Sequence, residues 1–185
     1  MSQLTPRQET HEHIKQVRIR LDYLIDMLVE RGLNHDKSKL EEPEASIFER
    51  ETPKLRGLTY GSPEYIEGVK KLGVALEHHY ANNRHHPEFF KGKRECNGCF
   101  KRFPSDWESP CDVCGYTQST VRFDLLEMNL LDIIEMLVDW DAASMRHANG
   151  DIFKSIEINQ QRFNYTDETK AILINTAKLL KGMPR

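Results

Sequence analysis

The spacing of apolar residues predicts a mainly helical chain. Apolar side chains recur every three or four positions over residues 8–31, which predicts a helix that ends at Gly32. A second helix is expected to begin at Ser62-Pro63 and to continue to about Asn82, because Ser is a favoured N-cap and Pro fits the first turn. Similar periodicity in the last third of the chain predicts three more helices, at residues 123–147, 152–163 and 167–181.

The stretch of residues 33–62 interrupts this helical pattern. Prolines and glycines recur too often there for a long regular element, so we expect loops with at most a short helix around residues 44–50. Patterns typical of β-strands are weak outside a cysteine-rich stretch. We therefore predict an all-α fold, in which a helical domain made of residues 1–92 and 121–185 carries a small insertion at residues 93–120.

The four cysteines of the chain all fall within this insertion. They form two Cys-x-x-Cys pairs separated by eleven residues, and each pair has a Gly near its second Cys. Four thiolates at this spacing suit tetrahedral zinc, and glycine suits the tight turns around such a metal. The insertion is therefore predicted to be a zinc-ribbon-like module with a structural zinc bound by Cys96, Cys99, Cys111 and Cys114.

Composition and charge narrow the function classes. The 185 residues are 38% hydrophobic and 30% charged, which is typical of a soluble globular protein with a packed core. The net charge of -3 argues against a dominant nucleic-acid or anionic-membrane surface. No apolar run approaches the roughly 20 residues of a membrane span, and the N-terminus lacks an apolar signal core. We expect a cytoplasmic protein without a membrane partner, and its oligomeric state is left open.

Histidine is the compositional anomaly of the sequence. Six of the eight histidines fall in three clusters, and another, His35, adjoins Asp36. Imidazoles and carboxylates are common ligands of divalent metals, so His35 and Asp36 are candidate ligands at the centre of a metal site. Acidic residues also recur along one side of the helix predicted at 123–147, where Asp132 and Asp139 are rival candidates for a helical ligand and Glu135 for a supporting residue.

The order of these residues resembles the HD superfamily of metal-dependent phosphohydrolases. In that family a His on an early helix, a His-Asp pair and a distant helical Asp bind one metal, and His13, His35, Asp36 and Asp132 match these positions. Lys39 follows Asp36 by three residues, as in the His-Asp-x-x-Lys form of HD-GYP-like members. The Gly-Tyr-Pro signature of HD-GYP proteins is absent, so the resemblance does not imply hydrolysis of cyclic-di-GMP.

A second part of the resemblance concerns a second metal. The segment with His78 and His79, followed shortly by His86, is similar to the segment that binds the second ion in binuclear members. Most of the chain, apart from the cysteine insertion, also resembles an uncharacterised HD-like family of phages and bacteria. The implied ligands of one or two ions are His13, His35, Asp36, His78, His79, His86 and Asp132.

These ligands suit hydrolytic chemistry. A divalent ion held by imidazoles and carboxylates lowers the pKa of bound water and supplies a nucleophile near neutral pH. Such mixed ligands suit Mn, Fe, Co, Ni, Zn or Mg. We therefore predict a metal-dependent phosphohydrolase acting on a nucleotide or related phosphate ester, with Asp36, Lys39 and Glu44 as catalytic residues and Glu88 as an alternative to Glu44. The cations expected to bind phosphate are Lys39, Arg146, Lys154 and Arg162.

Two other functions fit the same sequence. The four-cysteine knuckle could make the chain a non-catalytic binding or regulatory module that contacts protein or nucleic acid. Five basic residues bias the neighbourhood of the knuckle toward such a role: Lys91, Lys93, Arg94, Lys101 and Arg102. The second alternative is an oxygenase, since some HD-like proteins use di-iron sites.

Overall fold

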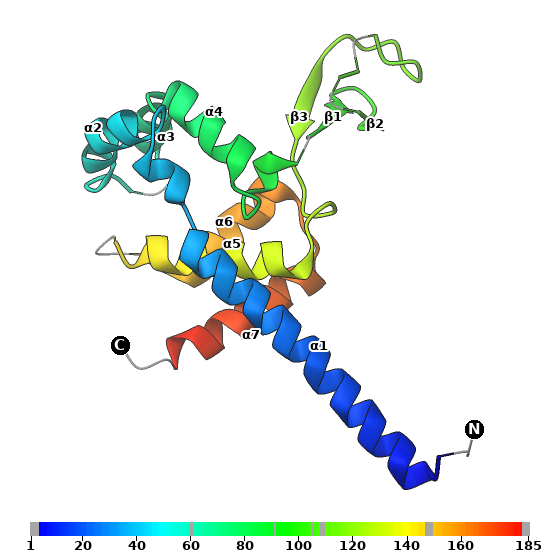
Figure 1. Cartoon of the computed structure of the whole chain (residues 1–185). Helices are drawn as coiled ribbons and strands as arrows, with labels where there is room; N and C mark the ends of the chain where they lie inside the picture. The colour runs from blue at the N-terminus through cyan, green and yellow to red at the C-terminus, as the bar shows by residue number, and fades with distance from the viewer. Residues whose placement is uncertain are drawn as a thin grey trace. The chain divides into compact units, whose positions relative to one another are not determined.

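The computed structural model describes residues 4–59, 61–90, 92–104, 106–107, 110–146 and 150–182. It divides into two compact units, Met1–His35 and Asp36–Arg185, whose positions relative to one another are not determined (Figure 1). This division differs from the predicted one, which joined the first helix to the later helices in one domain.

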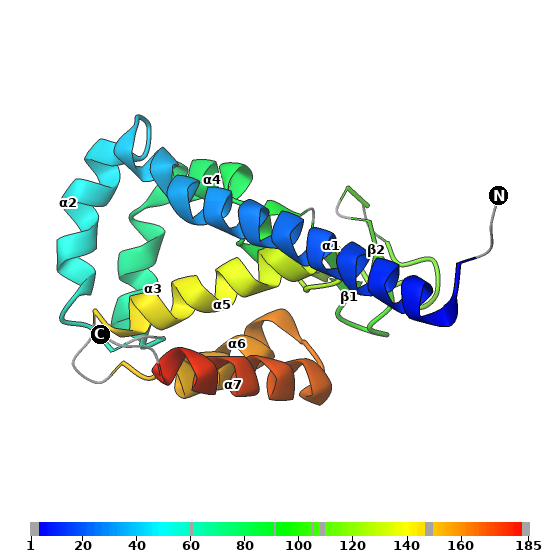
Figure 2. The same ribbon diagram turned by 60° about the horizontal axis from the view of Figure 1, so that its bottom comes forward.

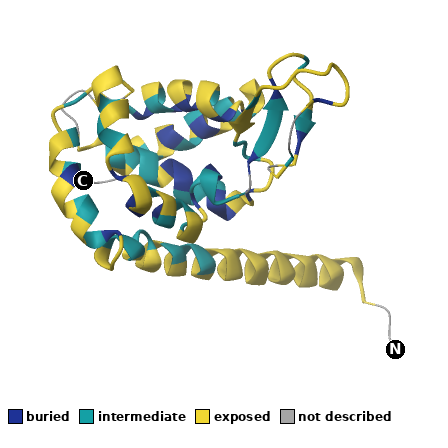
Figure 3. Ribbon diagram, turned by 90° about the horizontal axis from the view of Figure 1, so that it is seen from above, coloured by how far each residue is buried: buried dark blue, intermediate teal, exposed yellow. Residues whose placement is uncertain are grey.

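The first unit contains one long helix, α1 (Pro6–Asn34). Its start is specified locally, because the Thr5 side chain accepts from the Gln8 backbone N–H while the Gln8 side chain accepts from the Thr5 N–H. The helix covers the predicted residues 8–31 and extends beyond them at both ends. It contains no buried residue (Figure 3).

The second unit opens with short helical elements. A 3-10 turn, η1 (Lys37–Leu40), precedes α2 (Ala45–Leu55), which is longer than the predicted short helix. One helix was expected up to Asn82, but the structure has two, α3 (Pro63–Lys70) and α4 (Gly73–Asn82). Gly73 explains the break, because its φ of +45 lies in the left-handed region that glycine tolerates. A second 3-10 turn, η2 (Pro87–Phe89), follows α4.

Three helices at the end of the chain supply the main core. They are α5 (Leu130–Ser144), α6 (Ile152–Phe163) and α7 (Asp167–Lys181), which lie side by side in Figure 2. The bounds of α6 and α7 match the prediction, whereas α5 begins at Leu130 rather than at residue 123. Its predicted end, His147, lies outside the described residues. The buried residues of this core are Leu137, Ile152, Ile156, Phe163, Tyr165, Leu173 and Ala177.

The late start of α5 has a local cause. The Asn129 side chain accepts from the Asp132 backbone N–H, and the Asp132 carboxylate accepts from the Asn129 N–H. This reciprocal pair caps the first turn and specifies where the helix begins. Apolar periodicity alone extended the predicted helix back to Phe123, which instead packs against the core from an irregular segment.

The cysteine-rich stretch forms a small antiparallel sheet. Its strands are β1 (Lys93–Cys96), β2 (Arg102–Phe103) and β3 (Ser119–Arg122), in the order β2-β1-β3. The register places Cys96 opposite Ser119 and Arg94 opposite both Val121 and Phe103. The chain is thus mainly helical with β structure confined, in the described residues, to the region around the cysteines.

A helix that crosses a bilayer is about 20 residues long and predominantly apolar. Across the described ranges, no helix is both long enough and apolar enough to cross a bilayer.

The core of the second unit yields a stability prediction. Ile156 is fully buried between the last three helices, so Ile156→Ala should lower the free energy of unfolding by about 2–5 kcal/mol through lost burial and a cavity. Ile158→Ala is the matched control, because Ile158 lies on the same helix but is exposed. Its effect should stay within about 0.5 kcal/mol. Urea unfolding followed by circular dichroism measures both, and equal losses would contradict the described packing.

Candidate metal centres

Four potential metal ligands meet in the second unit. Asp36, His79, His85 and His86 each offer one ligand atom, and these atoms all lie within 4.8 Å of one another. The residues come from different elements: Asp36 precedes η1, His79 lies in α4, and the other two lie between α4 and η2. We call these four residues the His/Asp centre.

The separations within the His/Asp centre match those of ligands around one ion. Nε2 of His79 lies 2.9 Å from Nε2 of His86 and 3.3 Å from Oδ1 of Asp36. Nε2 of His85 lies 3.5 Å from the same Asp36 oxygen. Metal bonds of about 2.1 Å would separate neighbouring ligand atoms by about 3.0 Å in an octahedron and about 3.4 Å in a tetrahedron. The donors therefore fit a divalent ion of either geometry.

A buried carboxylate, Glu44, and a half-buried one, Glu135, contact the Nδ1 atoms of the two most buried imidazoles. Nδ1 of His79 lies 2.9 Å from Oε2 of Glu44, and Nδ1 of His85 lies 3.2 Å from Oε1 of Glu135. A carboxylate at Nδ1 favours the tautomer with the proton on that nitrogen, which leaves the Nε2 lone pair for a metal. Both imidazoles are thus oriented with their Nε2 atoms toward the other donors of the centre.

The backbone and Lys39 orient the carboxylate of Asp36. Asp36 has a φ of +56, a left-handed conformation that Asp adopts more readily than most residues. Nζ of Lys39 donates to Oδ2 at 2.6 Å, while Oδ1 is the oxygen that faces the imidazoles. The two oxygens of one carboxylate therefore have separate roles, one toward a cation and one toward the centre.

The surroundings of His86 keep its imidazole neutral. Burial, together with the neighbouring His85 and His79, lowers the pKa of His86 to about 2, against an opposing effect of Asp36. A protonated imidazole has no lone pair for a metal, so a neutral ring is the form that binding requires.

The adjacent histidines of α4 behave differently. His78 is 41% exposed, and its Nδ1 lies 2.8 Å from Oε1 of Glu44, outside the group of four converging donors. Consecutive helical residues point about 100° apart, so only one of the two can face the centre. His85, which the sequence analysis did not select, takes the place expected of His78. The turn that carries it before Pro87 was visible in the sequence, but nothing there distinguished it from a solvent-exposed loop.

The structure also separates the rival acidic residues of α5. Asp132 caps the helix, and its Oδ2 accepts from Nη2 of Arg84 at 3.0 Å. It is not among the four donors that converge in the His/Asp centre. Asp139 instead has a carboxylate oxygen within 4.8 Å of one from Asp36. Asp139 is therefore the better placed of the two rivals, and Glu135 supports His85 as a neighbour of the centre.

The two predicted ligands of the first unit cannot share an ion. His35 follows His13 by 22 residues, and α1 is continuous between them. At 1.5 Å per residue the helix separates them by about 33 Å. The expectation that both bind one metal is therefore wrong. His35 directly precedes Asp36 in the chain and stays a predicted ligand.

The predicted phosphate-binding cations are dispersed. Lys39 contacts Asp36, whereas Arg162 forms an ion pair with Glu88 and lies over the ring of Phe163. Glu88, an alternative catalytic residue in the sequence analysis, is thereby engaged with Arg162. The other two predicted cations, Arg146 and Lys154, are exposed at the end of α5 and in α6. Lys39 is thus the predicted cation that the structure brings to the His/Asp centre.

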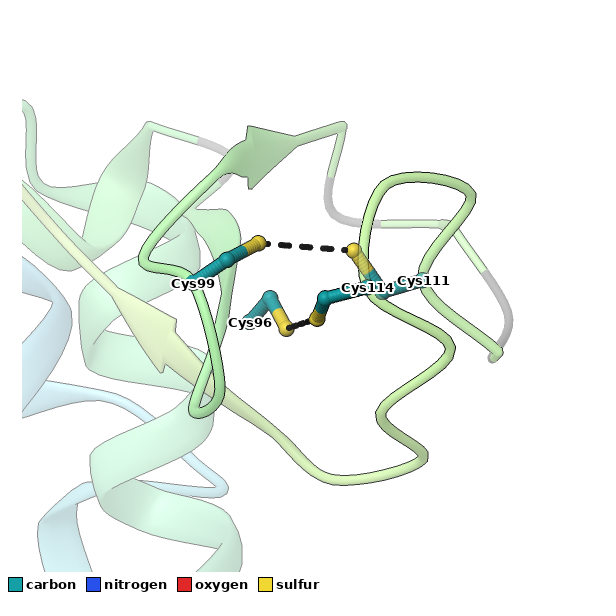
Figure 4. A group of neighbouring side chains, drawn as sticks. All are labelled: Cys96, Cys99, Cys111 and Cys114. Atoms are coloured by element: carbon teal, nitrogen blue, oxygen red, sulfur yellow. Dashed lines mark hydrogen bonds between the residues drawn. The ribbon is translucent and has the colours of Figure 1, made fainter.

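The four cysteines form a second, separate cluster, shown in Figure 4. All are free thiols, with Sγ atoms within 4.8 Å of one another, and the two Cys-x-x-Cys pairs face each other. The Sγ atoms of Cys96 and Cys114 lie 3.6 Å apart, as do those of Cys99 and Cys111. Zinc–sulfur bonds of about 2.3 Å in a tetrahedron imply edges of about 3.8 Å. The cluster therefore fits the predicted zinc.

The two cysteine pairs have the same backbone hydrogen bonds. The Phe100 N–H donates to the Cys96 carbonyl at 2.9 Å, and the Gly115 N–H donates to the Cys111 carbonyl at 2.8 Å. Phe100 and Gly115 also share positive φ angles, of 59 and 70. A left-handed conformation costs a residue with a side chain about 1–2 kcal/mol, so Gly115 suits the turn and Phe100 adopts it under strain. Both turns have the form of a metal-binding knuckle.

The thiols of the cluster differ in acidity. Burial opposes ionisation of Cys96, but hydrogen bonds with the backbone N–H groups of Cys99 and Gly98 and with the thiols of Cys114 and Cys111 together lower the pKa of this thiol to about 7. The backbone N–H of Tyr116 favours the thiolate of Cys114, but burial and the neighbouring sulfur atoms raise its pKa to about 12. Four thiolates packed this closely need a cation to ionise together, which is what zinc would supply.

The fold and the two clusters define a mainly helical protein with two candidate metal centres of different chemistry. The chain belongs to the family described as "Family of unknown function (DUF5662)", whose model matches residues 2–182. No curated protein and no solved structure matches the chain. The activity is therefore argued from the centres themselves.

The cysteine cluster yields a prediction about metal content. Cys111→Ser removes one of four thiolates and should lower bound zinc by about one equivalent per chain, because structural zinc needs all four ligands. Val113→Ser is the control, since Val113 is an exposed residue between two cysteines of the same knuckle and offers no ligand. Elemental analysis of the purified variants measures the zinc. Unchanged zinc in the Cys111 variant would exclude the assignment.

Proposed function

We propose that the chain is a metal-dependent phosphohydrolase of the HD type, acting on a nucleotide or related phosphate ester. The observation that carries the proposal is the convergence of three imidazoles and one carboxylate in the His/Asp centre. Two of these imidazoles have a carboxylate at Nδ1, an arrangement common behind metal-binding histidines. The resemblance of the sequence to the HD superfamily supports the same conclusion.

The proposed reaction depends on water activation. A bound divalent ion would lower the pKa of a coordinated water and so supply the nucleophile near neutral pH. Asp36, His79, His85 and His86 would hold the ion, and His35 and Asp139 are proposed as further ligands. Imidazole-rich sites suit Mn, Fe, Co, Ni or Zn, and the carboxylates also suit Mg. The four cysteines would hold a structural zinc away from this reaction.

The side chains beside the ligands have separable tasks in this proposal. Lys39 already pairs with Asp36 at 2.6 Å, so its ammonium lies where it can also neutralise a phosphate oxygen. Both Glu44 oxygens are engaged by histidines, Oε1 by His78 and Oε2 by His79. We therefore assign Glu44 to positioning His79 rather than to proton transfer. Glu135 has the same task at His85.

The activity can be tested with a panel of metals and substrates. Metal-depleted protein is reloaded separately with Mn, Fe, Co, Ni, Zn or Mg and assayed for phosphate release from nucleotides and simple phosphate esters. We expect hydrolysis with at least one metal. His85→Ala should lower it on the order of 100-fold or more, because the variant loses a ligand whose supporting groups alone are typically worth 10- to 100-fold.

The control for this experiment is His11→Ala, which removes an exposed histidine of α1. It should keep wild-type activity and metal content. Absence of hydrolysis across the panel, in protein whose His/Asp centre is shown to be loaded, would rule out the proposed reaction. Oxygen-dependent turnover with iron in the same protein would instead favour an oxygenase.

A further inference from the structure

The loop that carries His85 and His86 is attached to α5 through Arg84. We propose that the ion pair between Arg84 and Asp132 is a positioning device, which sets the place of these imidazoles and thereby the metal affinity of the His/Asp centre. This inference rests on the proposed function, because it assumes that the centre binds a divalent ion. Neither residue of the pair is proposed to touch that ion.

Asp132 is a firm anchor for such a device. Its side chain is fully buried, and Oδ2 accepts from the Asn129 backbone N–H at 2.9 Å. The carboxylate lies in the first turn of α5, where the positive end of the helix dipole stabilises a negative charge. Both the cap and the dipole hold the carboxylate in one place, so a group that binds it is located relative to α5.

Arg84 binds this anchor with two nitrogens. Nε lies 3.3 Å from Oδ1 of Asp132 and Nη2 lies 3.0 Å from Oδ2. Two parallel contacts fix the orientation of the guanidinium as well as its distance. The rings of Phe89 and Phe90 lie 5.2 and 5.0 Å from the guanidinium carbon, which adds cation–π contacts from the same loop.

Because neighbouring loop residues contact neighbouring positions on α5, the ion pair of Arg84 also affects the position of the metal ligands. Arg84 and His85 are consecutive, and they contact Asp132 and Glu135, which are one turn apart on α5. Release of Arg84 would therefore remove an attachment of the loop to α5 that lies directly beside the contact between His85 and Glu135. His86 follows directly, and its Nε2 lies 2.9 Å from Nε2 of His79. A shift at Arg84 would disturb both imidazoles of the loop together.

The experiment compares Arg84→Met and Arg84→Lys with wild type. Co²⁺ is titrated into protein whose cysteine cluster is already filled with zinc, which Co²⁺ does not displace because zinc binds more tightly. Affinity is measured by competition with a chromophoric chelator, and ligand geometry by the visible absorption bands of the bound Co²⁺. These readouts respond to the position of the imidazoles and do not depend on enzymatic activity.

We expect Arg84→Met to weaken Co²⁺ binding about 10- to 100-fold, as is typical when a group that orients a ligand is removed, and to alter the absorption bands. Arg84→Lys keeps the charge but loses the contact through two nitrogens, so its loss of Co²⁺ affinity should be intermediate. The matched control is Arg50→Met. Arg50 is 60% exposed and pairs with the mostly buried Glu51, much as Arg84, 45% exposed, pairs with Asp132.

Each outcome bears on one of the two proposals. Wild-type affinity and bands in Arg84→Met, or an equal loss in Arg50→Met, would overturn the positioning role. If Arg84→Met does not fold, as judged by circular dichroism, Arg84→Lys decides the question: an intermediate loss supports the role and none rejects it. If wild-type protein with zinc in its cysteine cluster binds no Co²⁺, the proposed metal binding by the His/Asp centre is wrong, whatever the Arg84 variants show.

Discussion

The hydrogen bond between His79 and Glu44 joins two side chains that are both almost completely removed from water. Burying either one alone would cost several kcal/mol, so each needs the other. The bond ties α4 to the start of α2, and it turns Nε2 of His79 toward Asp36 and His86. The same contact thus joins two helices and orients a proposed metal ligand.

A second attachment completes the arrangement from the other side. The loop after α4 is held on α5 by Glu135, which contacts His85, and by the pairing of Asp132 with Arg84. Polar groups buried in this way rigidify a site only when their partners are all in place. The carboxylates of Glu44 and Glu135 therefore fix the orientation of the His79 and His85 imidazoles. Such preorganisation is what a catalytic metal centre requires.

The two centres differ in how far the sequence could predict them. The cysteine cluster was predictable, because two short pairs close onto one another through local turns and a three-stranded sheet. The His/Asp centre draws on residues from Asp36 to His86, and its members depend on which side of α4 and its following loop faces inward. The resemblance to the HD superfamily implied that His79 and His86 are ligands together with Asp36, but it could not show that His85 converges there and that His78 faces away.

The boundaries of the helices were also only partly predictable from the sequence. Periodicity predicted α6 and α7 with their observed bounds. Gly73 and the Asn129–Asp132 capping box overrode the apolar pattern elsewhere, breaking one predicted helix and delaying another. Asp132 illustrates the consequence for function. A helical Asp near conspicuous histidines suggests a ligand, whereas its position in the first turn makes it a cap and the anchor of Arg84.

The central claim is that the His/Asp centre binds a divalent ion in the unit formed by Asp36–Arg185. Crystals of metal-loaded protein, with diffraction recorded on both sides of the absorption edge of the added metal, test it most directly. The account predicts an anomalous peak bounded by Asp36, His79, His85 and His86, distinct from the zinc peak at the four cysteines. A zinc peak at the cysteines with no anomalous density among those four residues would contradict it.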